Sequence, residues 1–150
     1  EGRLPDFKFI DAVFKTQGYK SKNGIANLNV LNVVENKAER AGIVKNIGEL
    51  LSDDGVAIIT TRGDDVAAKA FKNGKDGALR KNVKRLEDGF IMGYGTKKQT
   101  FQKGFDQKEL EKYVQDILGK LFDVKIIPKK YEIVSKSNPG IIITRKKGGI

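Results

Sequence analysis

Carboxamide side chains stand where the first predicted strand ends. Residues 25–34 form a largely apolar run, and Asn29 and Asn32 lie in its second half. A carboxamide both donates and accepts hydrogen bonds, so these side chains can orient a cofactor or the exocyclic amine of a substrate. Asparagines that serve only a turn and the start of a helix are the alternative. On this chemistry we predict Asn29 and Asn32 as the catalytic positions.

A second group of candidates follows the next predicted strand, residues 56–61. Ligands of open α/β sheets gather beyond the carboxyl ends of the strands, so Arg62 stands where it can meet an anion. A surface ion pair is the alternative for Arg62. Asp64 is explained most simply as the N-cap of a short helix over residues 66–71.

The third group comes from a glycine-rich segment. Residues 73–100 show little periodicity, which indicates a long functional loop or hairpin. If this segment folds over the strand ends, Gln102 and Lys103, flanked by Phe101 and Phe105, can clamp a substrate, and a structural turn is the alternative. We predict substrate contacts at Arg62, Lys98, Phe101, Gln102 and Lys103.

Two capping boxes mark the helices that position these residues. Asn36 with Glu39 predicts a helix over residues 37–51, and Asp106 with Glu109 predicts another. The expected buried stripes are Ile43, Ile47, Leu50 and Leu51 in the first helix, and Leu110, Val114, Ile117 and Leu118 in the second, which Gly119 caps.

The strands complete the pattern. After the strand at 56–61, residues 122–127 and 141–144 read as two more strands, able to pair antiparallel around a turn at 137–140. The alternation predicts a single α/β domain over residues 1–150. Its expected fold is an open, mostly parallel Rossmann-like sheet with crossover helices and a C-terminal antiparallel hairpin.

The positive charge is concentrated in one segment. The chain has 29 basic and 19 acidic residues, and residues 69–103 hold ten basic and three acidic side chains, seven of the ten net charges. Such a field attracts nucleic acid, and the interleaved aromatics, among them Phe90 and Tyr94, are what base stacking uses. A solvated lysine-rich surface is the alternative; no amphipathic basic helix points to a membrane.

Absent residue types exclude several kinds of chemistry. The chain contains no histidine and no cysteine, which rules out zinc sites, disulfides and catalytic triads that use these residues. No apolar run approaches the ~20 residues of a membrane span, and no signal peptide opens the chain. We expect a small basic protein acting in the cytoplasm.

The order of these elements resembles the second half of a class I S-adenosylmethionine-dependent methyltransferase. The resemblance rests on residues 27–34, the helix at 37–51, the turn Ser52-Asp53-Asp54-Gly55 and the strand ending at Arg62-Gly63. Residues 100–105 before a capped helix are similar to methyltransferase-like domains of large phage polyvalent proteins and DNA-modification families. The resemblance implies S-adenosylmethionine as methyl donor, cofactor contacts at Asn27 and Asn29, and nucleic acid as substrate.

The glycine-rich donor-binding turn of that family is absent after every predicted strand. The chain is therefore expected to be either a piece whose cofactor half lies upstream or in a partner protein, or a small diverged domain.

Two other functions stay open. Asp6 and Asp11 loosely match the carboxylates that hold Mg²⁺ in nucleases, as an excised toxin domain would use them, and Glu35-Asn36-Lys37 has the spacing of Glu-x-Lys. A non-catalytic domain that binds nucleic acid or a protein is the other. We assign no metal ligand.

Overall fold

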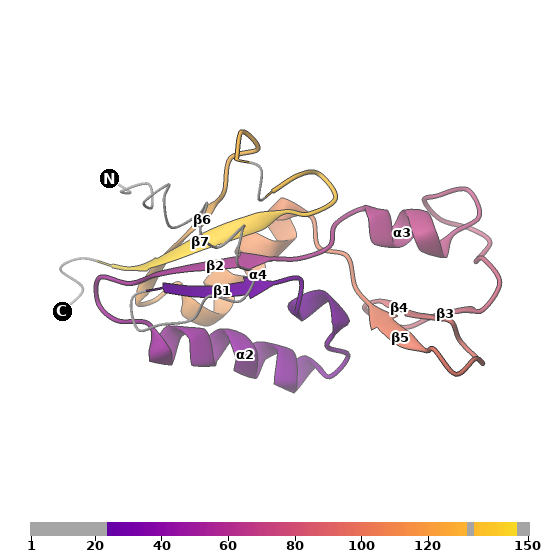
Figure 1. Cartoon of the computed structure of the whole chain (residues 1–150), viewed down its shortest axis with the longest axis horizontal. Helices are drawn as coiled ribbons and strands as arrows, with labels where there is room; N and C mark the ends of the chain where they lie inside the picture. The colour runs from indigo at the N-terminus through magenta and orange to yellow at the C-terminus, as the bar shows by residue number, and fades with distance from the viewer. Residues whose placement is uncertain (1–23, 132–133, 147–150) are drawn as a thin grey trace.

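Two sheets organise the chain. The computed structural model describes residues 24–131 and 134–146, which form a main lobe around a four-stranded sheet and a small lobe around a three-stranded sheet. The small lobe lies beyond the ends of β1 (Gly24–Leu28) and β2 (Val56–Thr60), joined to the main lobe by two crossing segments (Figure 1).

The four-stranded sheet is mixed. Its order is β1-β2-β7-β6, with β6 at Phe122–Ile126 and β7 at Gly140–Arg145. β1 pairs parallel to β2, whereas β7 pairs antiparallel to both β2 and β6. The expected C-terminal antiparallel pair is confirmed, but a mostly parallel sheet is not, because β7 is inserted between β2 and β6 and two of the three pairings are therefore antiparallel.

Helix α2 (Lys37–Leu50) is the crossover that makes β1 and β2 parallel. The predicted cap is present, since Asn36 accepts a hydrogen bond from the Glu39 backbone N–H at 3.0 Å. Of the predicted stripe, Ile47 and Leu51 are buried and Ile43 packs partly buried against the core, but Leu50 is 52% exposed. The buried residues within the helix are Arg40, Val44, Ile47 and Gly48.

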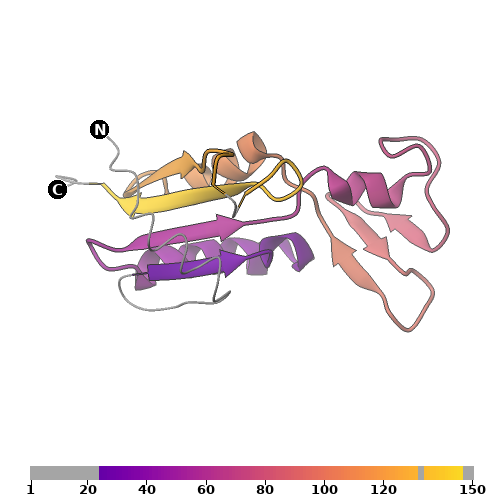
Figure 2. The same ribbon diagram turned by 45° about the horizontal axis from the view of Figure 1, so that its top comes forward.

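Helix α4 (Gln107–Leu118) follows the predicted pattern closely. Asp106 accepts from the Glu109 backbone N–H at 2.8 Å, and the buried positions are Leu110, Val114 and Leu118. Both α2 and α4 pack on one face of the four-stranded sheet, where their apolar residues meet those of the strands in one core (Figure 2).

The small lobe shows antiparallel hairpins over much of residues 73–100, the segment expected to be a long functional loop or hairpin. Residues 83–102 form β3 (Val83–Arg85), β4 (Phe90–Met92) and β5 (Thr100–Gln102), an antiparallel sheet in that order. Its apolar side packs on α3 (Asp65–Ala70) and the residue after it, with Phe71 and Phe90 in edge-to-face contact at 5.3 Å between ring centroids. These strands have only three residues each, too few to show a period in the sequence.

The predicted cap of α3 is wrong in its contact. Asp64 occupies the N-cap position, but its backbone is already helical and its side chain caps no amide of the helix. Its carboxylate instead accepts from Ser137 at 3.4 Å and lies 3.4 Å from the Lys136 ammonium. The loop after β6 thereby draws Asp64 away from its own helix.

Candidate functional site

A groove of about 390 Å³ opens between the carboxyl ends of β1 and β2, helix α3 and the small sheet. Both strand ends and both lobes contribute to it. The predicted residues that meet there are Asn29, Asn32, Arg62 and Gln102, joined by Asp65, Val66, Lys69, Met92 and Thr100. The second set was not predicted, because only the packing of α3 and the small sheet against the strand ends brings it to the groove.

Asn29 turns the chain out of β1. Its φ of 57° is left-handed, a conformation that asparagine adopts more readily than most residues. Its backbone N–H donates to the Thr60 carbonyl at 2.9 Å, and its side-chain oxygen accepts from the Thr60 hydroxyl at 3.4 Å. The side-chain amino group of Asn29 has no hydrogen bond to any residue that the structure describes, and it lies at the exposed end of the strand.

Asn32 lies deeper, in the short 3-10 helix η1 (Leu31–Val33), and is 2% exposed. Its amino group donates to the Gln102 side-chain oxygen at 3.5 Å, a long hydrogen bond across 70 residues of sequence. Its own side-chain oxygen is buried without a hydrogen-bond partner among the residues the structure describes. A buried acceptor in that state costs about 1–3 kcal/mol.

Charges in the groove are partly balanced. The Arg62 guanidinium is paired with the Asp65 carboxylate, which also accepts from the Gly63 backbone N–H at 3.2 Å. Lys69, one turn further along α3 and exposed, has no ion pair within the described part of the chain. The groove therefore has carboxamides that can donate and accept hydrogen bonds. It also has a net positive charge, which favours an anionic ligand.

Arg40 holds the small lobe against the main lobe, and the sequence analysis missed it. Its guanidinium donates to the Asp88 carboxylate at 2.9 Å and to the Val34 carbonyl at 2.7 and 3.1 Å, with the side chain 4% exposed. It also lies 5.7 Å from the centroid of the Phe101 ring. This contact fixes β5, and with it Gln102, relative to the strand ends. Its spacing from the buried Val44 and Ile47 places Arg40 on the apolar face of α2, and a charged residue at such a position indicates a buried partner.

The remaining predicted residues lie elsewhere. Phe101 is buried on the opposite side of the small sheet from Gln102. Lys103 pairs with Glu109 at 2.7 Å and lies over the Phe105 ring, and Lys98 stands in the exposed turn before β5. Asn27 lies within β1, outside the groove lining, with its side-chain oxygen buried and unpartnered among the described residues.

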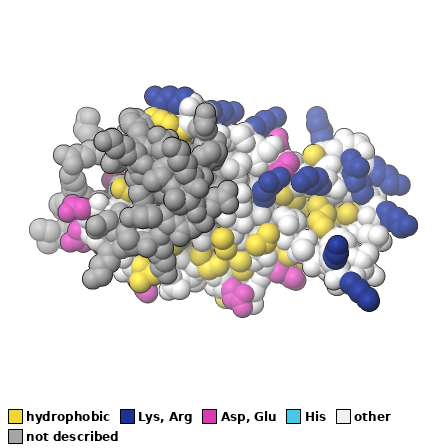
Figure 3. All heavy atoms as spheres, viewed as in Figure 1, with side chains coloured by type: hydrophobic (Ala, Val, Ile, Leu, Met, Phe, Trp, Pro, Cys, Tyr) yellow, Lys and Arg dark blue, Asp and Glu magenta, His cyan; other side chains and the backbone are white. Residues whose placement is uncertain are grey.

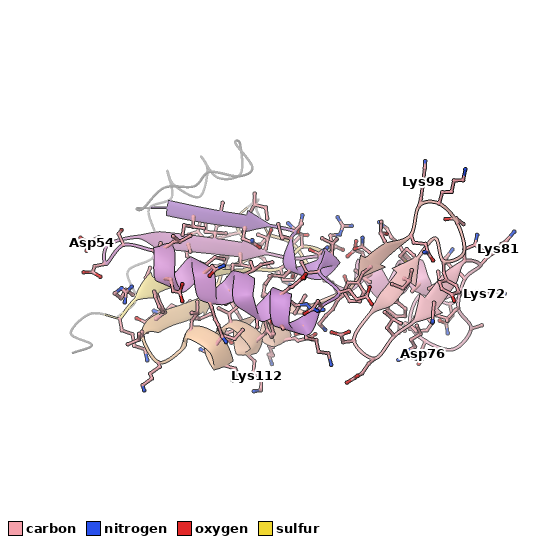
Figure 4. The ribbon with its side chains drawn as sticks, turned by 90° about the horizontal axis from the view of Figure 1, so that it is seen from below. Asp54, Lys72, Asp76, Lys81, Lys98 and Lys112 are labelled. Carbon is pink, nitrogen blue, oxygen red and sulfur yellow. The ribbon has the colours of Figure 1, made fainter. Side chains whose placement is uncertain are left out.

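A band of unpaired cations covers the small lobe. Of the ten basic residues in 69–103, only Lys103 has an ion pair within the described part of the chain. The acids Glu87 and Asp88 turn instead to Lys37 and Arg40 on α2. Lysine and arginine side chains gather over this lobe (Figure 3), and Lys72, Lys81 and Lys98 point outward from it (Figure 4).

Carboxylates do not gather into a metal site within the described residues, where no group of three or more Asp or Glu side chains could hold an ion. Asp6 and Asp11 lie outside that part of the chain. Asn36 of the Glu35-Asn36-Lys37 motif caps α2. None of the helices described has the length and apolar character that crossing a membrane requires.

Comparison with known proteins bears on the fold. No protein-family profile matches the chain, and no curated protein matches it. Among solved structures, a S-adenosylmethionine-dependent methyltransferase from Clostridium acetobutylicum is similar, with a TM-score of 0.50 and 12% sequence identity over 93% of this chain and 70% of that chain. The chain therefore has a methyltransferase-like fold. Its resemblance to phage proteins stays a prediction.

The described residues do not form a complete site for S-adenosylmethionine. Gly63 follows β2, but a Cβ there would lie 2.6 Å from the Lys136 carbonyl oxygen, so its small size serves packing against a loop. β1 is followed by Asn29 and Val30, with no glycine to admit a ligand closely. Asp65, the acid of the groove, is bound to Arg62. These residues therefore lack the glycine-rich turn and the free acid that the resemblance led us to expect at a site for S-adenosylmethionine.

Proposed function

We propose that this domain binds nucleic acid through the small lobe and takes a nucleobase into the groove, as the substrate side of a S-adenosylmethionine-dependent methyltransferase. One observation carries the proposal: residues 69–103 hold nine basic residues without ion pairs among the described residues, and one of them, Lys69, lines a groove of carboxamides at the strand ends. The phosphates of a polynucleotide match the first feature, and the edge of a base matches the second.

The groove supports recognition of an exocyclic amine. The Gln102 side-chain oxygen, which accepts only a long hydrogen bond from Asn32 at 3.5 Å, can accept from such an amine, while the amino group of Asn29 can donate to a ring nitrogen. Carboxamides bind adenine in this way, through one donor and one acceptor. Asn29 and Gln102 are the residues expected to hold the base, with Asn32 hydrogen-bonded to Gln102 behind it, and Lys69 is expected to hold the adjacent phosphate.

The methyl donor needs more than the residues described. S-adenosylmethionine would supply the electrophilic methyl group, and residues 24–131 and 134–146 orient only the acceptor in this proposal. In this proposal a further segment or a partner protein would supply the contacts to the donor. Cytoplasmic action and a nucleic-acid partner belong to the same proposal.

Nucleic-acid binding is tested by its salt dependence. Each phosphate contacted on a single strand contributes about −0.7 to the slope of log affinity against log salt concentration. A variant with Lys72→Ala, Lys81→Ala and Lys98→Ala should therefore bind a fluorescent single-stranded oligonucleotide more weakly, with a slope flatter by about 2. The matched control carries Lys45→Ala, Lys108→Ala and Lys112→Ala on α2 and α4. A flat slope in the parent, or equal losses in the two variants, would refute binding by the small lobe.

Calorimetry with S-adenosylmethionine, with and without the oligonucleotide, tests the methyltransferase part separately. Heat that depends on added donor supports it. If neither titration gives heat, binding of S-adenosylmethionine is refuted and the proposal is reduced to a nucleic-acid-binding domain. Cleavage of the oligonucleotide that requires Mg²⁺ and is lost with Asp6→Ala or Asp11→Ala would replace methyl transfer by the nuclease alternative.

A further inference from the structure

A second groove lies on the other face of the small sheet and plays no part in the site above. Its volume is about 310 Å³. Ile91 and Phe101 form its apolar side, and Tyr94, Lys84 and Glu35 surround it. It differs from the first groove in offering an exposed aromatic ring, and an acid that has no ion pair among the described residues.

The two grooves lie back to back across the edge strand β5. Ile91 and Phe101 are paired across β4 and β5 and line the second groove, whereas Gln102 and Met92 line the first. Neighbouring side chains of a strand point to opposite faces, which separates the two sets. Thr100, at the start of β5, lines both grooves. A flexible chain that passes over this edge can therefore reach both faces of the sheet.

Tyr94 is suited to stacking a base. Its side chain is 45% exposed, and the Lys84 ammonium lies 5.1 Å from the ring centroid. Aromatic rings beside lysines bind unpaired nucleotides by stacking the base and attracting the phosphate. A base held inside a duplex is stacked on its neighbours and cannot stack on Tyr94 as well.

Glu35 gives this groove a hydrogen-bond acceptor. Its side chain is exposed and has no ion pair within the described residues, although Lys84 lines the same groove. A carboxylate repels phosphate, but it accepts hydrogen bonds from the N–H groups of a base. Guanine presents two adjacent donors, N1–H and the 2-amino group, that match two carboxylate oxygens.

We propose that the second groove binds an unpaired guanine of a single-stranded nucleic acid, stacked on Tyr94 and hydrogen-bonded to Glu35. The inference rests on the proposed function, since it assumes that the small lobe binds nucleic acid. It adds the class of substrate: a single strand that crosses β5, with one base in each groove.

The first experiment measures the affinity of the full chain for a fluorescent oligouridine strand with one central guanine, and for the corresponding duplex. Tyr94→Ala should weaken single-strand binding by about 5- to 150-fold, the usual loss when one stacked base is released, with little change for the duplex. Tyr94→Phe keeps the ring and should bind as the parent does.

The outcomes separate the two proposals. If Tyr94→Ala binds the single strand as the parent does while the triple lysine variant still loses affinity, the second groove is refuted and the proposed function stands. If neither variant loses affinity, the proposed function fails. An equal loss for Tyr94→Phe and Tyr94→Ala refutes stacking.

Replacing the guanine by inosine tests Glu35, because inosine lacks the 2-amino group. The parent should prefer guanine, and Glu35→Gln should reduce that preference because a carboxamide oxygen accepts only one of the two hydrogen bonds well. Equal binding of the two strands by the parent would overturn guanine recognition.

Discussion

Replacing Arg40 by methionine tests how the small lobe is held. Methionine keeps much of the length of the side chain but leaves the Asp88 carboxylate and the Val34 carbonyl without their donor. Removing one partner of a buried ion pair costs about 3–5 kcal/mol, and the 22% exposure of Asp88 favours the lower value. We expect a loss of about 3 kcal/mol in the free energy of unfolding, a large share of the roughly 5–15 kcal/mol of a typical domain.

The neighbouring ion pair, between Lys37 and Glu87, provides the matched control. Glu87 pairs with Lys37 at 3.1 Å, also between the small lobe and α2, but the two side chains are 85% and 60% exposed. Exposed pairs contribute about 0–1 kcal/mol, so Lys37→Met should cost at most that. The two variants thus differ mainly in the burial of the ion pair that each removes.

Chemical denaturation monitored by circular dichroism gives both free energies, and amide hydrogen exchange locates the loss. Exchange should accelerate in β3, β4 and β5 of the Arg40→Met variant more than in β1 and β2. A loss below about 1 kcal/mol for Arg40→Met, equal to that of Lys37→Met, would refute the assignment of Arg40 as the contact that holds the lobes.

Four further substitutions have calculable effects. Gly104→Ala should destabilise by about 1–3 kcal/mol in denaturation, since its Cβ would overlap the Gly63 carbonyl oxygen, whereas Gly42→Ala, with open space around it, should stabilise α2 by up to about 1 kcal/mol. Asp106→Ala should cost about 1 kcal/mol by removing the cap of α4, measured in the same way. Burial raises the pKa of Tyr113 above its usual 10.0, with Arg40 lowering it and Asp88 raising it. The neutral phenol is favoured in the folded state, so its stabilisation is complete below pH 10 and is lost as the pH rises through the folded-state pKa. Tyr113→Phe should therefore lose less stability above pH 10 than the parent.

Each of these has a clear contrary result. Equal effects of Gly104→Ala and Gly42→Ala would mean that the crossing segments tolerate a side chain. Unchanged stability of Asp106→Ala would deny the cap. Parallel curves of stability against pH for the parent and Tyr113→Phe above pH 10 would show that this phenol titrates alike in both states.

Features that depend on near neighbours in the chain could be predicted from the sequence. Both helix starts were located because the cap and its amide are three residues apart, as in Asn36 with Glu39. The strand ends that form the groove followed from apolar runs, so Asn29, Asn32 and Arg62 were found together with their place in the fold. The concentration of charge in residues 69–103 needed only composition.

Contacts between distant residues were decided by the tertiary structure. Asn32 meets Gln102 across 70 residues, and Arg40 meets Asp88 across 48. No local pattern encodes such pairs, because each depends on how the two lobes pack. The face of β5 to which Phe101 points was equally hidden, since a three-residue strand has no measurable period.

The sequence by itself determined where the two long helices begin, which segments form the four-stranded sheet and where the positive charge lies, because these follow from interactions a few residues apart and from composition. The tertiary structure alone decided that β7 enters the sheet between β2 and β6, and that acids of the basic segment pair with α2. Because Glu87 and Asp88 pair with α2, they do not neutralise the cations of their own segment. The total charge can be counted from the sequence, but which charges pair depends on the folded structure.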